Sequence, residues 1–215
     1  RLVEGYGLSE TAPVATCNAM QDINKPGSIG QVVPGTEISI HDLEAPNDVV
    51  PTGERGEVWI KGPQVMKGYL NRPQETADSL REGWFRTGDV GYMDEDGHFF
   101  LVDRLKDLIL CSGYNVYPRM VEEAIYLHPA VAEVTVIGID DDYRGQSPKA
   151  FVKLKEGEKI TEDEMKTFLA DKLSKIEMPS QIEFRLELPK TIIGKLSKKE
   201  LVAEEVEKHK GSSTS

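Results

Sequence analysis

The sequence of 215 residues is poor in cysteine and histidine and contains no long apolar run. Its two cysteines, Cys17 and Cys111, lie far apart, and no two of its four histidines stand three or four positions apart. A disulfide framework and a zinc site built from neighbouring ligands are therefore excluded as organising features. No stretch reaches the ~18 apolar residues of a membrane-spanning helix and no signal peptide opens the chain, so we expect a cytoplasmic location.

Positive charge is scarce in the first half of the chain. The sequence has 26 Lys and Arg against 37 Asp and Glu, a formal net charge of −11. Residues 1–103 contain 8 basic and 17 acidic side chains, whereas residues 104–215 contain 18 and 20. Nucleic acids and anionic membranes need a net basic face, so neither is expected as the main partner.

The first half has the pattern of a β-rich domain. Short alternating runs broken by Gly and Pro between residues 27 and 61 predict half-buried strands in a sandwich or open barrel. A short helix is predicted from Pro73 to Leu80, and a hairpin turn over residues 94–97. We therefore expect a β-rich, barrel-like part over residues 1–103.

The second half alternates strands with helices. Helices are predicted to open at Pro118 and at two capping boxes, Thr161 with Glu164 and Ser197 with Glu200. Together the two halves predict an α+β fold. Its expected parts are residues 1–103, a hinge over 104–107, a small α+β domain over 108–208 and a disordered tail over 209–215.

Six short stretches follow one another along the chain. They are residues 5–10 (GYGLSE), 56–62 (GEVWIKG) with 68–71 (GYLN), 83–89 (GWFRTGD), 103–107 (DRLKD), 112–118 (SGYNVYP) and 189–195 (PKTIIGK). Together they resemble the adenylate-forming, AMP-binding enzymes, a superfamily of acyl-CoA synthetases, firefly-type luciferases and peptide-synthetase adenylation domains. Among the branches, residues 68–73 and 131–145 look most like the acyl-CoA synthetases, and the fatty-acid–CoA ligase branch is the one we expect. The resemblance makes residues 1–103 the end of the large AMP-binding domain and residues 108–208 the small mobile C-terminal domain.

The resemblance implies a reaction in two steps. A carboxylic acid attacks the α-phosphorus of ATP, expels pyrophosphate and forms an acyl-adenylate, which the thiol of CoA then converts to acyl-CoA and AMP. ATP or AMP, Mg²⁺ and CoA are the implied cofactors and cosubstrates, and a medium- or long-chain fatty acid is the expected acid. The phosphate-binding loop and the acyl pocket of such enzymes precede the region matched here, so we expect the 215 residues alone to be inactive.

The first of the six stretches resembles part of the nucleotide site. Tyr6, with Gly7, corresponds to the aromatic position that stacks on adenine. Ser9 supplies a hydroxyl near the α-phosphate, and Glu10 corresponds to the carboxylate associated with Mg²⁺, a hard ion that prefers oxygen ligands.

Asp89 and Arg104 correspond to the residues that contact the ribose. An ionised aspartate suits this role because each of its two oxygens can accept one hydroxyl donor. Lys195 corresponds to the catalytic lysine of the adenylation step, on a loop expected to be extended. An ammonium on a long flexible stem can follow charge as it moves between phosphate and carboxylate oxygens.

The second step is expected to use a different set of residues. Lys106 occupies the hinge position about which the small domain rotates in the superfamily. The loop of Ser112, Gly113, Tyr114 and Asn115 is then presented to CoA, and Gly113 allows a close approach to the pantetheine arm.

Three positions depart from the superfamily pattern, and two other functions remain open. Asp103 replaces a common Gly, Met120 replaces a common Glu, and Leu110 stands where some luciferase-like members have a lysine, which disfavours luciferase. The alternatives are a peptide-synthetase adenylation domain that loads a carrier protein and a non-catalytic binding module. The expected partners are small molecules, and the oligomeric state is left open, with a homo-oligomer among the options.

Overall fold

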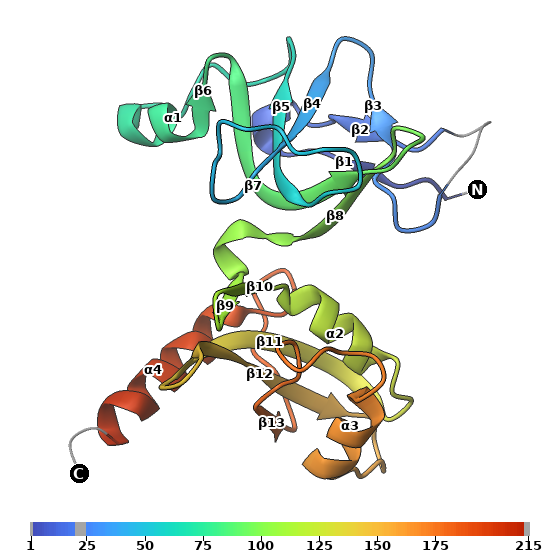
Figure 1. Cartoon of the computed structure of the whole chain (residues 1–215), viewed down its shortest axis with the longest axis vertical. Coiled ribbons are helices and arrows are strands. Elements are labelled where there is room, and N and C mark those ends of the chain that lie inside the picture. The colour runs from blue at the N-terminus through green and yellow to red at the C-terminus, as the bar shows by residue number, and fades with distance from the viewer. Residues whose placement is uncertain (1, 20–24, 213–215) are drawn as a thin grey trace. The chain divides into compact units, whose positions relative to one another are not determined.

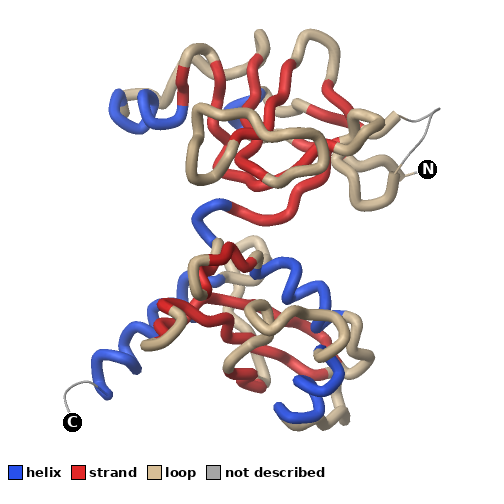
Figure 2. The backbone as a smooth tube through the Cα atoms, in the orientation of Figure 1, coloured by secondary structure: helices blue, strands red, loops and turns tan. Residues whose placement is uncertain are grey.

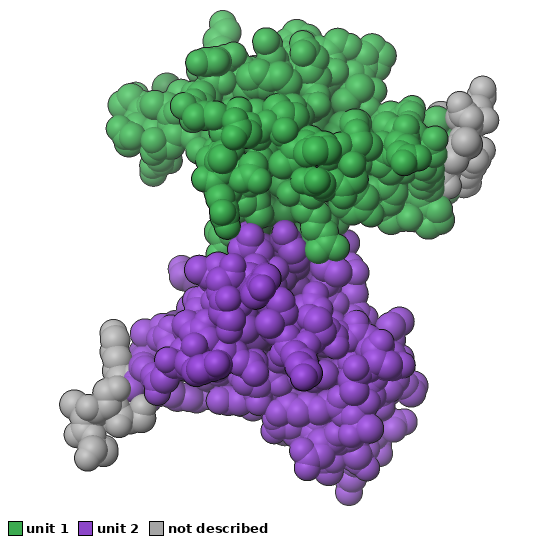
Figure 3. All heavy atoms as spheres, viewed as in Figure 1, with its two compact units in different colours: residues 1–106 green, residues 107–215 purple. Residues whose placement is uncertain are grey.

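The computed structural model describes residues 2–19 and 25–212 and divides the chain into two compact units (Figure 3). Unit 1 comprises Arg1–Lys106 and unit 2 comprises Asp107–Ser215. The division falls beside Lys106, within the four residues predicted as a hinge. None of the helices in the described ranges is long and apolar enough to cross a membrane.

Unit 1 consists of two antiparallel sheets with little helix (Figures 1 and 2). The smaller sheet contains β1 (Gly5–Tyr6), β2 (Thr16–Cys17) and β3 (Gln31–Val32). The larger sheet runs β4 (Glu37–His41), β5 (Gly56–Lys61), β7 (Trp84–Met93) and β6 (Leu80–Arg81), with β8 (Phe99–Arg104) also paired to β7. Helix α1 (Pro73–Ser79) and two 3₁₀ turns, η1 (Ser9–Thr11) and η2 (Leu105–Asp107), complete it.

In the described residues the larger sheet of this β-rich part is open and does not close into a barrel. Strand β4 lies at one edge of this sheet, and among the described residues it pairs with neither β6 nor β8. The chain that follows β4 folds back along this edge. Val49 lies opposite His41, and the amide of Val50 donates to the Ile40 carbonyl at 2.9 Å. The predicted turn over residues 94–97 is confirmed, with the amide of Gly97 donating to the Asp94 carbonyl at 3.1 Å.

Unit 2 is a mixed sheet with helices on both faces (Figure 1). The strand order is β10 (Tyr114–Val116), β9 (Ile109–Cys111), β12 (Gly145–Leu154) and β11 (Val131–Asp141), and β13 (Gln181–Phe184) pairs with β12 in parallel. Three helices cover it: α2 (Pro118–Tyr126), α3 (Glu162–Leu169) and α4 (Lys198–Ser212).

The two faces of this sheet bury alternate residues, as the period of a strand requires. Val134 and Val136 of β11 pack with α2 and α3, whereas Ile137 packs with Leu201 of α4 and with Phe151 of β12. Because helices cover both faces of the sheet, the central strands present apolar side chains on both faces.

The predicted capping box at Thr161 forms at the start of α3, whereas at Ser197 only a bond between the two side chains is present. The Thr161 hydroxyl accepts the Glu164 amide, and Glu164 in turn accepts the Thr161 amide. The Ser197 hydroxyl donates to Glu200 at the start of α4. Helix α4 continues to Ser212, beyond the predicted start of the tail at residue 209, and residues 213–215 lie outside the described ranges.

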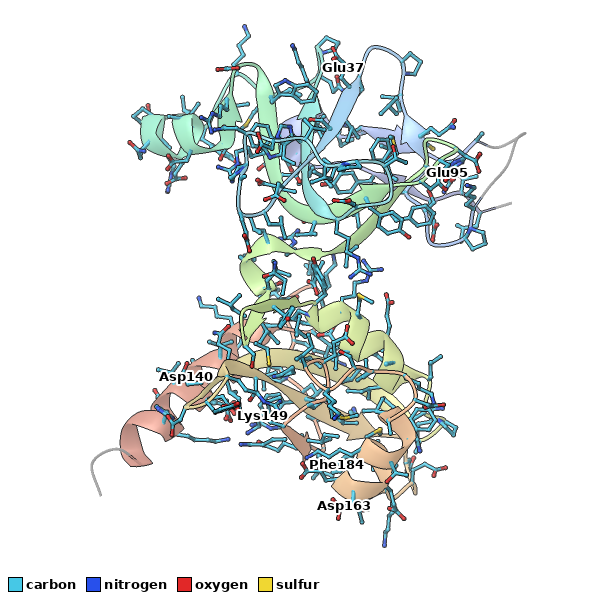
Figure 4. The ribbon with its side chains drawn as sticks, in the orientation of Figure 1. Glu37, Glu95, Asp140, Lys149, Asp163 and Phe184 are labelled. Carbon is cyan, nitrogen blue, oxygen red and sulfur yellow. The ribbon has the colours of Figure 1, made fainter. Side chains whose placement is uncertain are left out.

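A buried lysine ties α4 to the sheet (Figure 4). The side chain of Lys149 is 6% exposed, and its Nζ lies 3.0 Å from Glu183 of β13 and 2.9 Å from Glu205 of α4. Arg185 adds ion pairs to Glu183 and to Glu204, both at 2.7 Å. Burial alone would raise the pKa of Glu183, but hydrogen bonds from Lys149 and Arg185 lower it from 4.5 to about 2.

The lowered pKa of Glu183 makes unit 2 sensitive to acid. A carboxyl whose pKa is depressed by folding adds stability above its unfolded pKa, and that stability is lost as pH falls toward the folded value. We expect the free energy of unfolding to fall by about 1–2 kcal/mol between pH ~5 and ~2 through this group, after allowing for solvent screening. Urea unfolding followed by circular dichroism measures it, and Glu183→Gln should flatten the decline. An equal flattening in Glu187→Gln, which removes an exposed carboxylate, would contradict this assignment.

Candidate functional site

Three of the predicted nucleotide residues come together in unit 1. The Tyr6 hydroxyl donates to Asp89 Oδ2 at 2.5 Å, and Arg104 Nε lies 3.4 Å from Asp89 Oδ1. Asp89 and Arg104 are directly opposite each other on β7 and β8, which explains their meeting. Asp89 is buried, and burial together with this carboxylate raises the pKa of Tyr6. Tyr6 therefore keeps its proton and acts as a donor.

A cleft with a volume of about 770 Å³ lies beside this cluster within unit 1. Of the predicted residues, Gly7, Ser9, Glu10 and Arg104 line it directly. Thr87 and Gly88, which immediately precede Asp89, also line it. Further lining comes from Glu57, Tyr69, Asp78, Ser79, Phe85 and Arg86.

The loop after β1 is held in a tight conformation that only glycine permits at its start. A Cβ on Gly7 would lie 1.5 Å from the Pro13 carbonyl oxygen, so any larger residue forces the loop apart. The buried Thr11 hydroxyl accepts the Leu8 amide at 2.9 Å and donates to the Leu8 carbonyl at 3.1 Å. These bonds leave Ser9 exposed at the cleft.

Glu10 is oriented by Tyr69, a residue that our sequence analysis did not single out. The Tyr69 hydroxyl donates to Glu10 Oε1 at 2.9 Å, and the Met66 amide donates to the Glu10 carbonyl at 2.8 Å. Burial and the bond to Glu10 raise the pKa of Tyr69, which stays a donor. In the described ranges no three His, Cys, Asp or Glu side chains gather closely enough to hold a metal ion by themselves.

Glu57 is the most buried carboxylate of the cleft and was also missed as a separate residue. It is 3% exposed, and its Oε2 accepts the Trp59 indole N–H and the Arg86 guanidinium, both at 2.9 Å. Its Oε1 accepts the Gly88 amide at 3.3 Å. The Thr87 hydroxyl accepts the Asp89 amide at 3.0 Å and donates to the Val58 carbonyl, so the turn before Asp89 is held from both sides. The sequence signal that could have identified Glu57 is its place as the one acidic residue of the otherwise mostly apolar strand β5.

Lys195 lies in unit 2, in a closed hairpin rather than the extended loop expected. The Thr191 amide donates to the Lys195 carbonyl at 2.7 Å, and the Lys195 amide donates to the Thr191 hydroxyl at 3.2 Å. Gly194 has a φ of 81°, the left-handed conformation that the turn needs. The Lys195 side chain is exposed.

The predicted CoA loop joins β9 to β10 as a two-residue hairpin turn. Ser112 and Gly113 have φ values of 52° and 82°, the sign required at both central positions of a type I′ turn. The Ser112 amide donates to the Arg144 carbonyl at 2.7 Å, and Tyr114 and Asn115 are exposed beside the turn. The structure thus groups Tyr6, Gly7, Ser9, Glu10, Asp89 and Arg104 in unit 1, and Lys195 and the Ser112–Asn115 loop belong to unit 2.

Two family models match the chain. The model described as AMP-binding enzyme matches residues 1–70, and the model described as AMP-binding enzyme C-terminal domain matches residues 120–195. A long-chain-fatty-acid–CoA ligase from Bacillus subtilis is 51% identical over 209 residues, which are 97% of this chain and 37% of that relative.

Solved structures agree with the sequence matches. ATP-bound MatB from Rhodopseudomonas palustris superposes with a TM-score of 0.87 at 35% identity, covering 93% of this chain and 40% of that one. The o-succinylbenzoate CoA synthetase of Bacillus subtilis, in complex with an acyl-adenylate, gives a TM-score of 0.83 at 33% identity over the same shares. The chain spans about two fifths or less of the length of each of these proteins. The chain belongs to the AMP-binding enzymes of the adenylate-forming superfamily.

Proposed function

We propose that this chain is part of an ATP-dependent fatty-acid–CoA ligase, acting on a medium- or long-chain acid through an acyl-adenylate. The observation that carries the proposal is the buried Asp89 carboxylate held between Tyr6 and Arg104 beside the cleft. A carboxylate in this setting can accept two neighbouring hydroxyls, as a ribose presents them. The name of the Bacillus subtilis relative supports the choice of acid and of CoA.

The unit 1 residues would bind the nucleotide. The base and the sugar of a nucleotide are adjacent, which suits an aromatic ring at Tyr6 next to the carboxylate of Asp89. Arg104 would contact the same ribose, and Ser9 would lie near the α-phosphate at the exposed rim of the cleft. A Mg²⁺ ion here would be held by Glu10 together with phosphate oxygens, because Mg²⁺ with nucleotides usually takes only one or two protein carboxylates.

Lys195 would supply positive charge in the adenylation step. Two anions meet in this step and further negative charge gathers on the phosphoryl oxygens, so a mobile ammonium lowers the barrier. In the thioester step, rotation about Lys106 would replace Lys195 with the Ser112–Asn115 loop, whose exposed turn can approach CoA closely. The proposal includes a cytoplasmic location.

The experiment is a product assay on the intact protein, meaning the whole ligase of which this chain is proposed to be a part. With ATP, Mg²⁺, CoA and a medium- or long-chain fatty acid, we expect acyl-CoA, AMP and pyrophosphate. The 215-residue chain by itself is expected to give no ATP–pyrophosphate exchange. A product formed with a carrier protein but not with CoA would identify a peptide-synthetase adenylation domain. If no acid supports exchange in the intact protein, the chain is a non-catalytic binding module.

A further inference from the structure

The Lys195 hairpin has a buried base and an exposed tip. Lys190 and Leu196 face each other across it, and the Ser197 amide donates to the Pro189 carbonyl at 2.9 Å. At the base, Leu196 packs with Leu188, which is 4% exposed, in the core under α4. At the tip, Ile192 is fully exposed. Among the described residues, the buried packing of the hairpin against unit 2 is thus at its base and not at its tip.

The first lysine of the base is held by a carboxylate of β11. Lys190 Nζ donates to Glu133 Oε1 at 2.7 Å, and this bond raises the pKa of Lys190. The other oxygen of Glu133 is buried and has no hydrogen-bond partner among the described residues. Lys190 thus supplies the compensating charge for a carboxylate that is only 24% exposed.

Lys198, the first residue of α4 directly after the hairpin, is held by a carboxylate of α2. Lys198 Nζ lies 3.2 Å from Glu122 Oε1, and the two side chains are 26% and 18% exposed. The same Glu122 oxygen accepts the Val136 amide at 2.9 Å, on the edge of β11 that has no strand partner in the described part of the sheet. Glu122 is thereby bonded to the sheet as well as to Lys198.

We propose that Glu133 and Glu122 are positioning residues for the adenylation step. Each holds one of the lysines that flank Lys195, so that the hairpin keeps its shape when Lys195 engages phosphate. The inference rests on the proposed function. If the hairpin backbone is already ordered, the reaction does not have to pay the entropy of ordering it. The effect should therefore appear in kcat for adenylation more than in KM for ATP.

The test uses Glu133→Gln, Glu122→Gln and the double variant in the intact protein. Both substitutions keep the size of the side chain, and the amide oxygen introduced by Glu122→Gln can still accept the Val136 amide. We expect amide hydrogen exchange at Thr191 and Gly194 to become about tenfold faster in the double variant. We also expect kcat of ATP–pyrophosphate exchange to fall about tenfold, with KM for ATP within about twofold. Thioester formation from supplied acyl-adenylate should be unchanged.

The matched control is Asp171→Asn, which removes another ion pair of unit 2. Asp171 is 79% exposed and pairs with Lys172 at 2.6 Å, so neither hairpin exchange nor adenylation should change. Exchanging the charges of the pair, Lys190→Glu with Glu133→Lys, should restore much of the lost rate.

Three results would overturn the proposal. They are unchanged amide exchange in the hairpin, faster exchange with an unchanged adenylation rate, and equal losses in both half-reactions. If the unaltered protein performs no adenylation, the proposed function fails and the positioning assignment fails with it. Amide exchange would still report separately whether the two carboxylates hold the hairpin.

Discussion

Replacing Lys195 by alanine in the intact protein should lower the rate of ATP–pyrophosphate exchange by about a hundredfold to a thousandfold. The side chain is exposed on the hairpin and makes no part of the unit 2 core, so the fold should be retained. The loss arises because the transition state would lack a positive charge beside the oxygens on which negative charge gathers. The ATP–pyrophosphate exchange rate at saturating ATP measures the effect directly.

The two half-reactions separate Lys195 from a general effect on the protein. Acyl-CoA formation from supplied acyl-adenylate should proceed at the unaltered rate, because the second step is expected to use the Ser112–Asn115 loop instead. Lys199→Ala is the matched control, since Lys199 is an exposed lysine four residues along the chain in the first turn of α4. Equal loss of both half-reactions in Lys195→Ala would refute a role confined to adenylation.

Local features of the fold could be read from the sequence because their bonds join neighbouring residues. The capping box of Thr161 and Glu164 spans three residues, and the turn at Gly97 needs only a glycine and an aspartate nearby. The partner of the outer edge of β4 could not be read this way. It depends on how the connection around Val50 lies along β4, and alternation alone does not specify strand partners.

The candidate site was predictable in its residue types but not in its contacts. Motif resemblance pointed to Tyr6 and Asp89 separately, yet the bond between them joins positions 83 residues apart. Resemblance likewise pointed to Lys195, while the hairpin bonds around it appear only in the structure. Tyr69 and Glu57 were missed because each acts by orienting another group, and such a role leaves no motif of its own.

Replacing Glu57 by alanine should cost unit 1 about 2–4 kcal/mol of unfolding free energy. The substitution removes the acceptor for the Trp59 indole, the Arg86 guanidinium and the Gly88 amide at once. Arg86 is 30% exposed and can turn to water, which keeps the cost below that of a fully enclosed pair. Urea unfolding followed by tryptophan fluorescence reports unit 1 alone, because both tryptophans of the chain, Trp59 and Trp84, lie there.

Two further variants test whether the loss comes from the charge of Glu57, from the size of its side chain, or from the removal of any carboxylate. Glu57→Gln keeps an acceptor oxygen but loses the charge facing Arg86, so we expect about half the loss of the alanine variant. Glu37→Ala removes an exposed carboxylate from the neighbouring strand β4 and should change stability by less than about 0.5 kcal/mol (Figure 4). If Glu57→Ala unfolded no more easily than Glu37→Ala, the buried bonds would not hold the turn. Asp89 would then owe its position beside the cleft to its pairing with Arg104 across β7 and β8.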